Sequence, residues 1–246
     1  PYLLHETTVS AASGSSLTLA TPSPYPLLAG WGYTLAGQRW MLDSVGEWHH
    51  DPATGTLDAW MPNGGAPSAT VNVALRDYGI DLDGSKYVAV DGLAIRHARV
   101  AINMVRSTGS SVRNSALEDL ASHAVTAAGS SGVLVQANTI ARTGRDAISA
   151  NNDYLAPGTG LRVVDNTIAE SGVRWIGGRI MSLPLAQRAA VRTGVNATIT
   201  GNSLQHTGYL GIWAEAGSLV SDNLIQNGCL VLDDCGAVYA SGAGNG

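Results

Sequence analysis

The C-terminal two thirds of the chain repeats a short pattern of apolar and polar positions. An alternating apolar run, an asparagine and further apolar positions recur at Val112–Leu117, Val135–Ile140, Val163–Ile168, Ile199–Leu204 and Val220–Ile225. A second signature, a small residue followed by Val or Ile, recurs at Ala124-Val125, Ala147-Ile148, Gly211-Ile212 and Ala237-Val238. A strand-only period of this length predicts a β-solenoid, in which equivalent side chains of successive coils stack about 4.8 Å apart.

The repeated asparagines are expected at the turns between strands. They are Asn114, Asn138, Asn166, Asn202 and Asn223. Asparagine tolerates the left-handed backbone region, and stacked amides can bond to one another along the coils. We therefore interpret these asparagines as structural. Their spacing is uneven, and the longest insertion, 174–193, is expected to border a binding face.

Residues 1–85 read differently from residues 86–246. The first part is rich in proline and contains a predicted hairpin, with strands at 47–50 and 56–60 around a turn at 51–55. We expect a small N-terminal β-rich module or cap at 1–85 and a parallel β-helix at 86–246. The repeat stops where another coil is expected, which predicts that the chain is a fragment truncated at its C-terminus.

The composition of the chain argues against nucleic acid as a partner and against a membrane span. Charged residues make up 13% of the chain, against about 25% in an ordinary domain, and the net charge is −5. Such a chain has no basic field for nucleic acid, and it has no apolar run long enough to predict a membrane span. Five residues separate Cys229 from Cys235, a spacing that suits a small disulfide loop, with two buried thiols as the alternative. A disulfide would indicate a secreted, periplasmic or cell-surface protein.

The coils resemble the right-handed parallel β-helix repeats of the pectate-lyase-like superfamily. The run Trp40–Asp51, with Trp60–Pro62, is similar to the segment that precedes the helix in bacterial β-helix glycosidase-like proteins. The stretch Asp233–Tyr239 is similar to an acidic D-x-G-A-[IV]-Y stretch of those proteins, with Cys235 in place of the usual glycine. The resemblance implies an all-β fold and a polysaccharide or oligosaccharide ligand. It leaves the reaction open, because this fold hosts hydrolases, lyases, epimerases and non-catalytic modules.

Alignment of the small-aliphatic pairs predicts which side chains share a face. Val125, Ile148, Ile212 and Val238 are expected to point inward, and Thr126, Ser149, Trp213 and Tyr239 outward. Glycoside hydrolysis needs two carboxylates across the scissile bond. The candidates are Asp233, Asp234, Glu215 and, as a substitute partner, Asp146. The predicted substrate-binding residues are Trp213, Tyr239, Tyr209, Trp175, Arg145, His123 and His206.

A glycoside hydrolase is the leading interpretation, without a metal or another cofactor. The second is a polysaccharide lyase that eliminates next to a uronate, which needs a base and a cation that neutralises the carboxylate. Calcium would then be a candidate, with Asp233 and Asp234 as the close acid pair. The third is a non-catalytic module that binds glycans or serves as a spacer.

Overall fold

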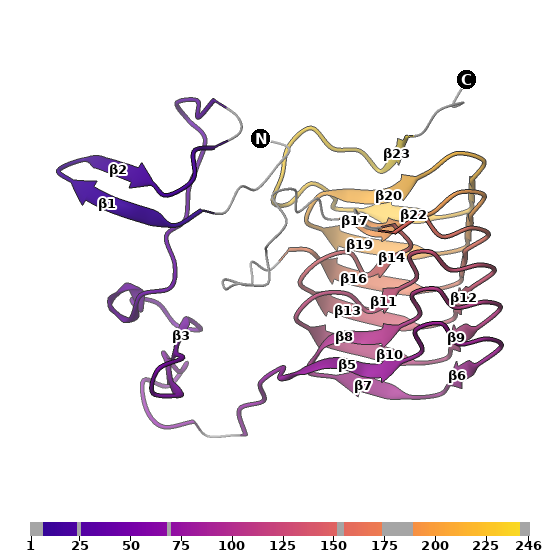
Figure 1. The fold of residues 1–246 in the computed structure, drawn as a ribbon, viewed down its shortest axis with the longest axis horizontal. Coiled ribbons are helices and arrows are strands. Elements are labelled where there is room, and N and C mark those ends of the chain that lie inside the picture. Colours follow the sequence, from indigo (N-terminus) through magenta and orange to yellow (C-terminus); the bar gives the residue numbers. More distant parts are fainter. Residues whose placement is uncertain (1–6, 24–25, 68–69, 152–154, 174–188, 242–246) are drawn as a thin grey trace. The chain divides into compact units, whose positions relative to one another are not determined.

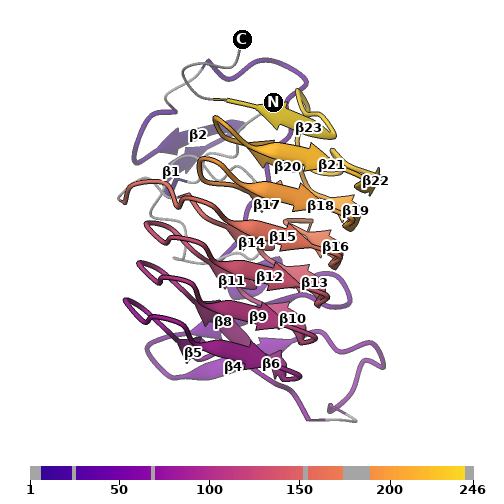
Figure 2. The ribbon, with the colours of Figure 1, turned by 90° about the vertical axis from the view of Figure 1, so that its right-hand side faces the viewer.

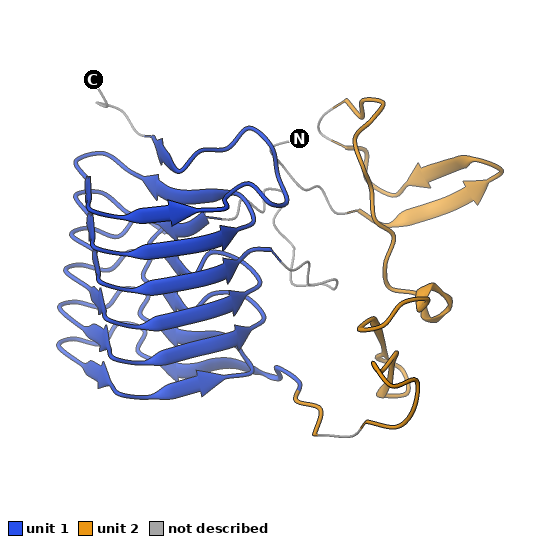
Figure 3. Cartoon of the chain, turned by 180° about the vertical axis from the view of Figure 1, so that it is seen from behind, with its two compact units in different colours: residues 1–4, 73–176, 185–246 blue, residues 5–72, 177–184 orange. Residues whose placement is uncertain are grey.

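The structure of the protein is a computed structural model that describes residues 7–23, 26–67, 70–151, 155–173 and 189–241. Contacts divide the described chain into two units, residues 7–72 and the residues from 73 onward (Figure 3). The described residues contain strands and one 3₁₀ turn, and no helix among them is long and apolar enough to cross a membrane.

The second unit is a stack of coils, each made of three strands that belong to three parallel sheets (Figure 1). Sheet 1 consists of β5 (Arg76–Asp81), β8 (Ala98–Asn103), β11 (Val125–Thr126), β14 (Ile148–Ser149), β17 (Ala189–Arg192), β20 (Leu210–Ala214) and β23 (Val238–Ala240). Sheet 2 consists of β6 (Ala89–Asp91), β9 (Ser111–Arg113), β12 (Leu134–Gln136), β15 (Arg162–Val164), β18 (Thr198–Thr200) and β21 (Leu219–Ser221). Sheet 3 consists of β7 (Ala94–Arg96), β10 (Ala116–Leu120), β13 (Thr139–Thr143), β16 (Thr167–Ser171), β19 (Ser203–Thr207) and β22 (Leu224–Gln226). The all-β solenoid that the repeat predicts is confirmed.

Three columns of aliphatic side chains build the core, one from each sheet. Each strand turns one Val, Ile or Leu inward. The strands stack coil on coil (Figure 2), and their parallel register places each of these residues against its equivalent in the next coil. The column of sheet 1 is Ile80, Ile102, Val125, Ile148, Val191, Ile212 and Val238. Those of sheets 2 and 3 include Val112, Val135, Val163 and Ile199, and Leu117, Ile140, Ile168 and Leu204. Apart from partly buried Ile80 and exposed Val238, at the two ends of the sheet 1 column, these are among the most deeply buried residues of the chain, so the core runs along the axis of the stack.

A ladder of amides occupies the turn between sheets 2 and 3. Asn166 Nδ2 donates to Asn202 Oδ1 (3.0 Å) and to the carbonyls of Val135 and Val164, while its Oδ1 accepts from Asn138 Nδ2 (2.9 Å). Asn202 bonds to Asn223 in the same way (2.8 Å). The residue before each ladder asparagine adopts the left-handed conformation, so the asparagine itself faces inward. These preceding residues are Ala137, Asp165, Gly201 and Asp222, with φ between 54° and 70°.

The inclusion of Asn114 in this ladder is wrong by one residue. Asn114 has the left-handed φ of 49° and is exposed, and the ladder position is taken by Ser115, whose N–H donates to Asn138 Oδ1 (3.0 Å). The sequence pattern misleads here because asparagine suits both positions of the turn.

The β-helix begins before the boundary expected at residues 85 and 86. Strand β5 is already in register with β8, from Arg76 opposite Ala98 to Asp81 opposite Asn103. The first coil therefore includes residues that the sequence assigned to the N-terminal module.

The N-terminal unit contains two antiparallel hairpins, β1 (Val9–Ser13) with β2 (Ser16–Leu19) and β3 (Trp48–Asp51) with β4 (Thr56–Ala59), and the 3₁₀ turn η1 (Arg39–Met41). The predicted hairpin around residues 51–55 is confirmed. Asp51 closes its turn by accepting from the N–H of Ala53 and the hydroxyl of Thr54, and these bonds lower the pKa of the Asp51 carboxyl. None of the described residues from 7 to 72 is buried, so this described part has no hydrophobic core of its own.

Candidate functional site

The candidate site lies on the outer face of sheet 1. In each strand, the residue that follows the inward aliphatic side chain points away from the core. Parallel register stacks these residues into one line, here named the outer column: Asp81, Asn103, Thr126, Ser149, Arg192, Trp213 and Tyr239. None of them belongs to the central core cluster.

The first three residues of the outer column bond to one another. Asn103 Nδ2 donates to Asp81 Oδ1 (2.8 Å), and Thr126 Oγ1 donates to Asn103 Oδ1 (2.8 Å). Asn103 is buried. Because these side chains form hydrogen bonds with one another from coil to coil, this lower end of the outer column leaves few donors and acceptors for a ligand.

The last three residues of the outer column form a stack of a different kind. The Arg192 guanidinium lies 4.7 Å from the centroid of the Trp213 ring, within the range of a cation–π contact. The Trp213 and Tyr239 rings meet edge to face, with centroids 5.5 Å apart and an interplanar angle of 71°. Trp213 Nε1 donates to Ser241 Oγ (2.5 Å), and Tyr239 is 48% exposed. The upper end therefore presents a continuous cationic and aromatic surface.

Glu215 lies beside this stack, two residues beyond Trp213. Its N–H donates to Thr193 Oγ1 (2.9 Å), and its Oε1 accepts from Asn151 Nδ2 (3.2 Å). Register places Gly194 on the coil between Asn151 and Glu215. A Cβ at Gly194 would lie 1.8 Å from the Gly158 carbonyl oxygen, so only glycine fits there. Because Gly194 has no side chain, the Asn151 amide can reach the Glu215 carboxylate on the coil beyond. This hydrogen bond holds the half-buried carboxylate in place.

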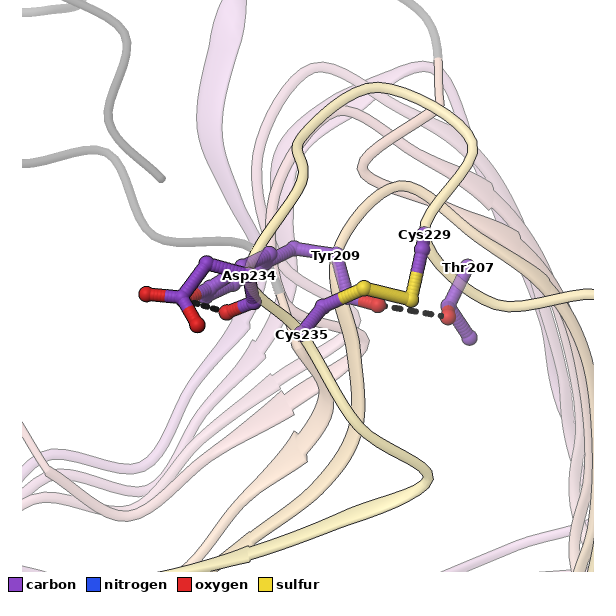
Figure 4. Close-up of a disulfide and its surroundings, with 5 residues drawn as sticks. All are labelled: Thr207, Tyr209, Cys229, Asp234 and Cys235. Carbon is purple, nitrogen blue, oxygen red and sulfur yellow. Dashed lines mark hydrogen bonds between the residues drawn. A yellow bond between two sulfur atoms is a disulfide. The ribbon is translucent and has the colours of Figure 1, made fainter. Parts of the chain in front are cut away.

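The disulfide between Cys229 and Cys235 is present, and its loop lies beside the start of β20 (Figure 4). The N–H groups of Val231 and Leu232 donate to the Gly208 carbonyl (2.9 and 3.1 Å). Leu232 is 1% exposed and forms a small cluster with Ala189, Tyr209 and Leu210, against which Trp213 packs. The loop thus supports the aromatic end of the outer column.

The predicted acids do not come together. Asp233 and Asp234 are exposed in the disulfide loop, where the Asp234 carbonyl accepts from the Tyr209 hydroxyl (2.9 Å) (Figure 4). Glu215 follows the other end of β20, and the 5 residues of that strand span about 16 Å at a rise of ~3.3 Å per residue. This exceeds the separation of either type of glycosidase pair, about 5–9.5 Å.

Asp146 is also engaged elsewhere. It is 4% exposed, and its Oδ1 accepts from the N–H of Ala189 (2.8 Å) at the start of β17. The carbonyl of Asp146 lies 2.9 Å from His123 Nδ1. Burial lowers the pKa of His123, and the Asp146 carboxylate opposes this shift only in part. Asp146 and His123 therefore join neighbouring coils, and half-buried Arg145 directly precedes Asp146 in the chain.

None of the other predicted binding residues is placed on the outer face of sheet 1: one is buried, one lies on another sheet, and one is outside the described residues. Tyr209 is 4% exposed and lies under the disulfide loop, so it forms no outer wall. His206 is exposed on sheet 3, with Nε2 3.3 Å from Asn227 Nδ2, and thus lies on a different sheet from Trp213. Trp175 and most of the 174–193 insertion lie outside the described residues.

Sequence reasoning missed Arg192 because it assigned residues 174–193 to an insertion. The signal was present, since Ala190-Val191 is one more small-aliphatic pair and Arg192 follows it as Trp213 follows Ile212. Thr193 and Asn151, which hold Glu215, also became visible only through the register.

Two further features bear on ligands. Among the described residues, no three His, Cys, Asp or Glu side chains gather into a group able to hold a metal ion. An open hollow of about 670 Å³ lies in the N-terminal unit and is lined partly by Trp40 and Trp60. It contains no residue of the outer column.

Comparison with known proteins gives one family. The family model described as a right-handed β-helix region matches residues 69–245. Among solved structures, the chain is similar to a mutant of DFA-IIIase from Arthrobacter chlorophenolicus, with 10% identity and a TM-score of 0.40, over 68% of this chain and 51% of that chain. This chain thus spans about half the length of that enzyme. No curated protein matches. The match over most of the stacked coils establishes that the chain belongs to the right-handed β-helix family.

Proposed function

We propose that this protein binds a polysaccharide along the outer column of sheet 1. The stack of Arg192, Trp213 and Tyr239 on successive coils carries the proposal. A sugar ring has an apolar C–H face and a rim of hydroxyls, and Trp and Tyr offer both a flat apolar surface and a polar group. The resemblance of the coils to polysaccharide lyases and glycoside hydrolases supports the same class of ligand by analogy.

Binding is tested by affinity electrophoresis in gels that contain one polysaccharide each, neutral or acidic. We expect at least one glycan to retard the protein, and Tyr239→Ala and Trp213→Ala to weaken binding about three- to tenfold each, the effect of one stacking contact. Tyr239 is half exposed, so its removal leaves the fold intact. The matched control is Tyr87→Ala, which removes a tyrosine that is 79% exposed in the first coil. Absence of retardation across the panel, or equal effects of Tyr87→Ala and Tyr239→Ala, would refute the proposal.

Cleavage of the bound glycan is a second candidate function, favoured by the fixed carboxylate of Glu215. Hydrolysis by a carboxylate pair requires a second acid near Glu215, whereas the predicted partners Asp234 and Asp146 lie toward the opposite end of the strands. Elimination needs one base and a cation instead, and Arg192 is a cation on the same face.

The two reactions leave different products. Elimination creates a double bond that absorbs in the near ultraviolet, whereas hydrolysis releases reducing ends without it. We expect Glu215→Gln to reduce either activity at least a hundredfold while leaving retardation in the gel unchanged, as for a general acid or base. If the wild type binds a glycan but releases neither product, the protein is a binding module.

A further inference from the structure

Arg192 is the feature of the outer column that the contacts within the protein do not explain. The structure gives its guanidinium one partner, the ring of Trp213 at 4.7 Å, and no hydrogen bond or ion pair with any described residue. Its Nε is buried and lacks an acceptor. Four other arginines of the described coils have carboxylate partners: Arg96 and Arg142, which bond to Glu118 (2.8 Å) and Asp119 (2.6 Å), and Arg99 and Arg106. A half-buried cation whose N–H groups have no acceptor among the described residues is expected to bind a partner from outside.

The surroundings of Arg192 define that partner. The guanidinium lies over the Trp213 ring, and its two terminal nitrogens keep four N–H donors that no described residue uses. A planar carboxylate matches this fork with two parallel hydrogen bonds. The nearest polar residue below Arg192 in the outer column is Ser149, a neutral hydroxyl. Glu215, on the coil above, is held by Asn151 and Thr193 and forms no ion pair with Arg192.

We propose that Arg192 binds the carboxylate of a uronosyl residue, which makes the ligand of the outer column an acidic polysaccharide. This inference rests on the proposed function. A uronosyl ring combines the two features that the stack would recognise, an apolar ring face for Trp213 and Tyr239 and a carboxylate for Arg192. The net charge of −5 opposes binding of polyanions in general, so an acidic glycan must gain its affinity from a local cation of this kind.

The test compares each acidic glycan with its own neutral form. Polygalacturonate, alginate and hyaluronan are used as such and after chemical reduction of their carboxylates to alcohols, which keeps the linkages and removes the charge. We expect the wild-type protein to bind at least one of them ten times more tightly than its reduced form. Arg192→Gln should bring this ratio close to one, and Arg192→Lys should retain part of it, because a lysine keeps the charge and loses the fork.

The matched control is Arg113→Gln, which removes an exposed arginine from sheet 2 and changes the net charge equally. It should leave the ratio unchanged. Equal binding of acidic and reduced glycans by the wild type would overturn this inference and leave the proposed function standing. Failure to bind either form of any of the three would overturn this inference, and the proposed function would fall with it only if no polysaccharide of the wider panel retards the protein. A preference for dextran sulfate over every uronate would overturn the assignment of a carboxylate.

Discussion

Two stacked columns of polar side chains run along this β-helix, and they differ in how far they satisfy themselves. In the asparagine ladder, each amide donates to the next coil and accepts from the previous one, so the same residue type repeats and closes its own hydrogen bonds. In the outer column the residue type changes from coil to coil, and bonding between neighbours gives way to the open stack that begins at Arg192. The repeated asparagines therefore stabilise the fold, whereas the changing residues of the outer column leave side-chain groups that a ligand can contact.

Interruption of the ladder should have the largest effect. Asn166→Ala removes the oxygen that accepts from the N–H and Nδ2 of Asn138, and the amide that donates to the Val135 carbonyl, in a buried turn. Each unsatisfied buried group costs about 1–3 kcal/mol, so we expect the free energy of unfolding to fall by about 3–5 kcal/mol. Urea denaturation followed by circular dichroism measures it.

The control for this change is Asn114→Gly, which alters an asparagine outside the ladder. Asn114 has φ 49°, a conformation that glycine adopts freely, and its Nδ2 bonds only to the exposed Asp91. We expect a loss below about 1 kcal/mol. A loss at Asn114 as large as at Asn166 would contradict the distinction between the two positions.

Opening the disulfide should have the next largest effect and should act on the outer column. Closure of a 7-residue loop is worth about 2 kcal/mol in the chain-entropy model. Replacement of Cys229 and Cys235 by serine should lower the melting temperature accordingly and loosen Leu232 beneath Trp213. Thermal melts with and without a reductant give the comparison. Identical curves for the oxidised wild type and the double variant would show that the loop contributes nothing to stability.

Removal of a link at the lower end of the outer column should affect stability and spare binding. Asn103→Ala breaks the bonds to Asp81 and Thr126, at a cost of about 1–2 kcal/mol for a buried polar site. We expect glycan affinity to stay within twofold of the wild type. A tenfold loss of affinity with unchanged stability would extend the binding face to the lower coils.

The smallest effect concerns pH and His123. Burial holds the pKa of its ring below the usual value of about 6.5, so the unfolded chain takes up a proton before the folded protein does. Stability should therefore fall as the pH drops below about 6.5 toward the lowered pKa of the folded state. In urea titrations at pH 7.5 and 5, His123→Gln should show a smaller decline than the wild type. An equal decline would assign the pH dependence to other groups.

The sequence predicted the features that local pattern encodes. One inward aliphatic residue per strand repeats often enough to reveal the coils, and a turn flanked by alternating residues reveals the hairpin β3–β4. The adjacency of Trp213 and Tyr239 followed from alignment of their small-aliphatic pairs. The spacing of Cys229 and Cys235 indicated their disulfide.

The tertiary structure decided what depends on register between coils of unequal length. It moved the ladder position from Asn114 to Ser115, buried Tyr209 and Asp146, and separated Glu215 from Asp234. It also placed Arg192, which the sequence had assigned to the insertion 174–193, on strand β17 beside Trp213. The sequence alone therefore determined that coils stack, because burial of one aliphatic column is a local and repeated requirement. Only the stacked coils determined which polar side chains meet, since hydrogen bonds act over about 3 Å and a shift of one residue turns a side chain to the other face.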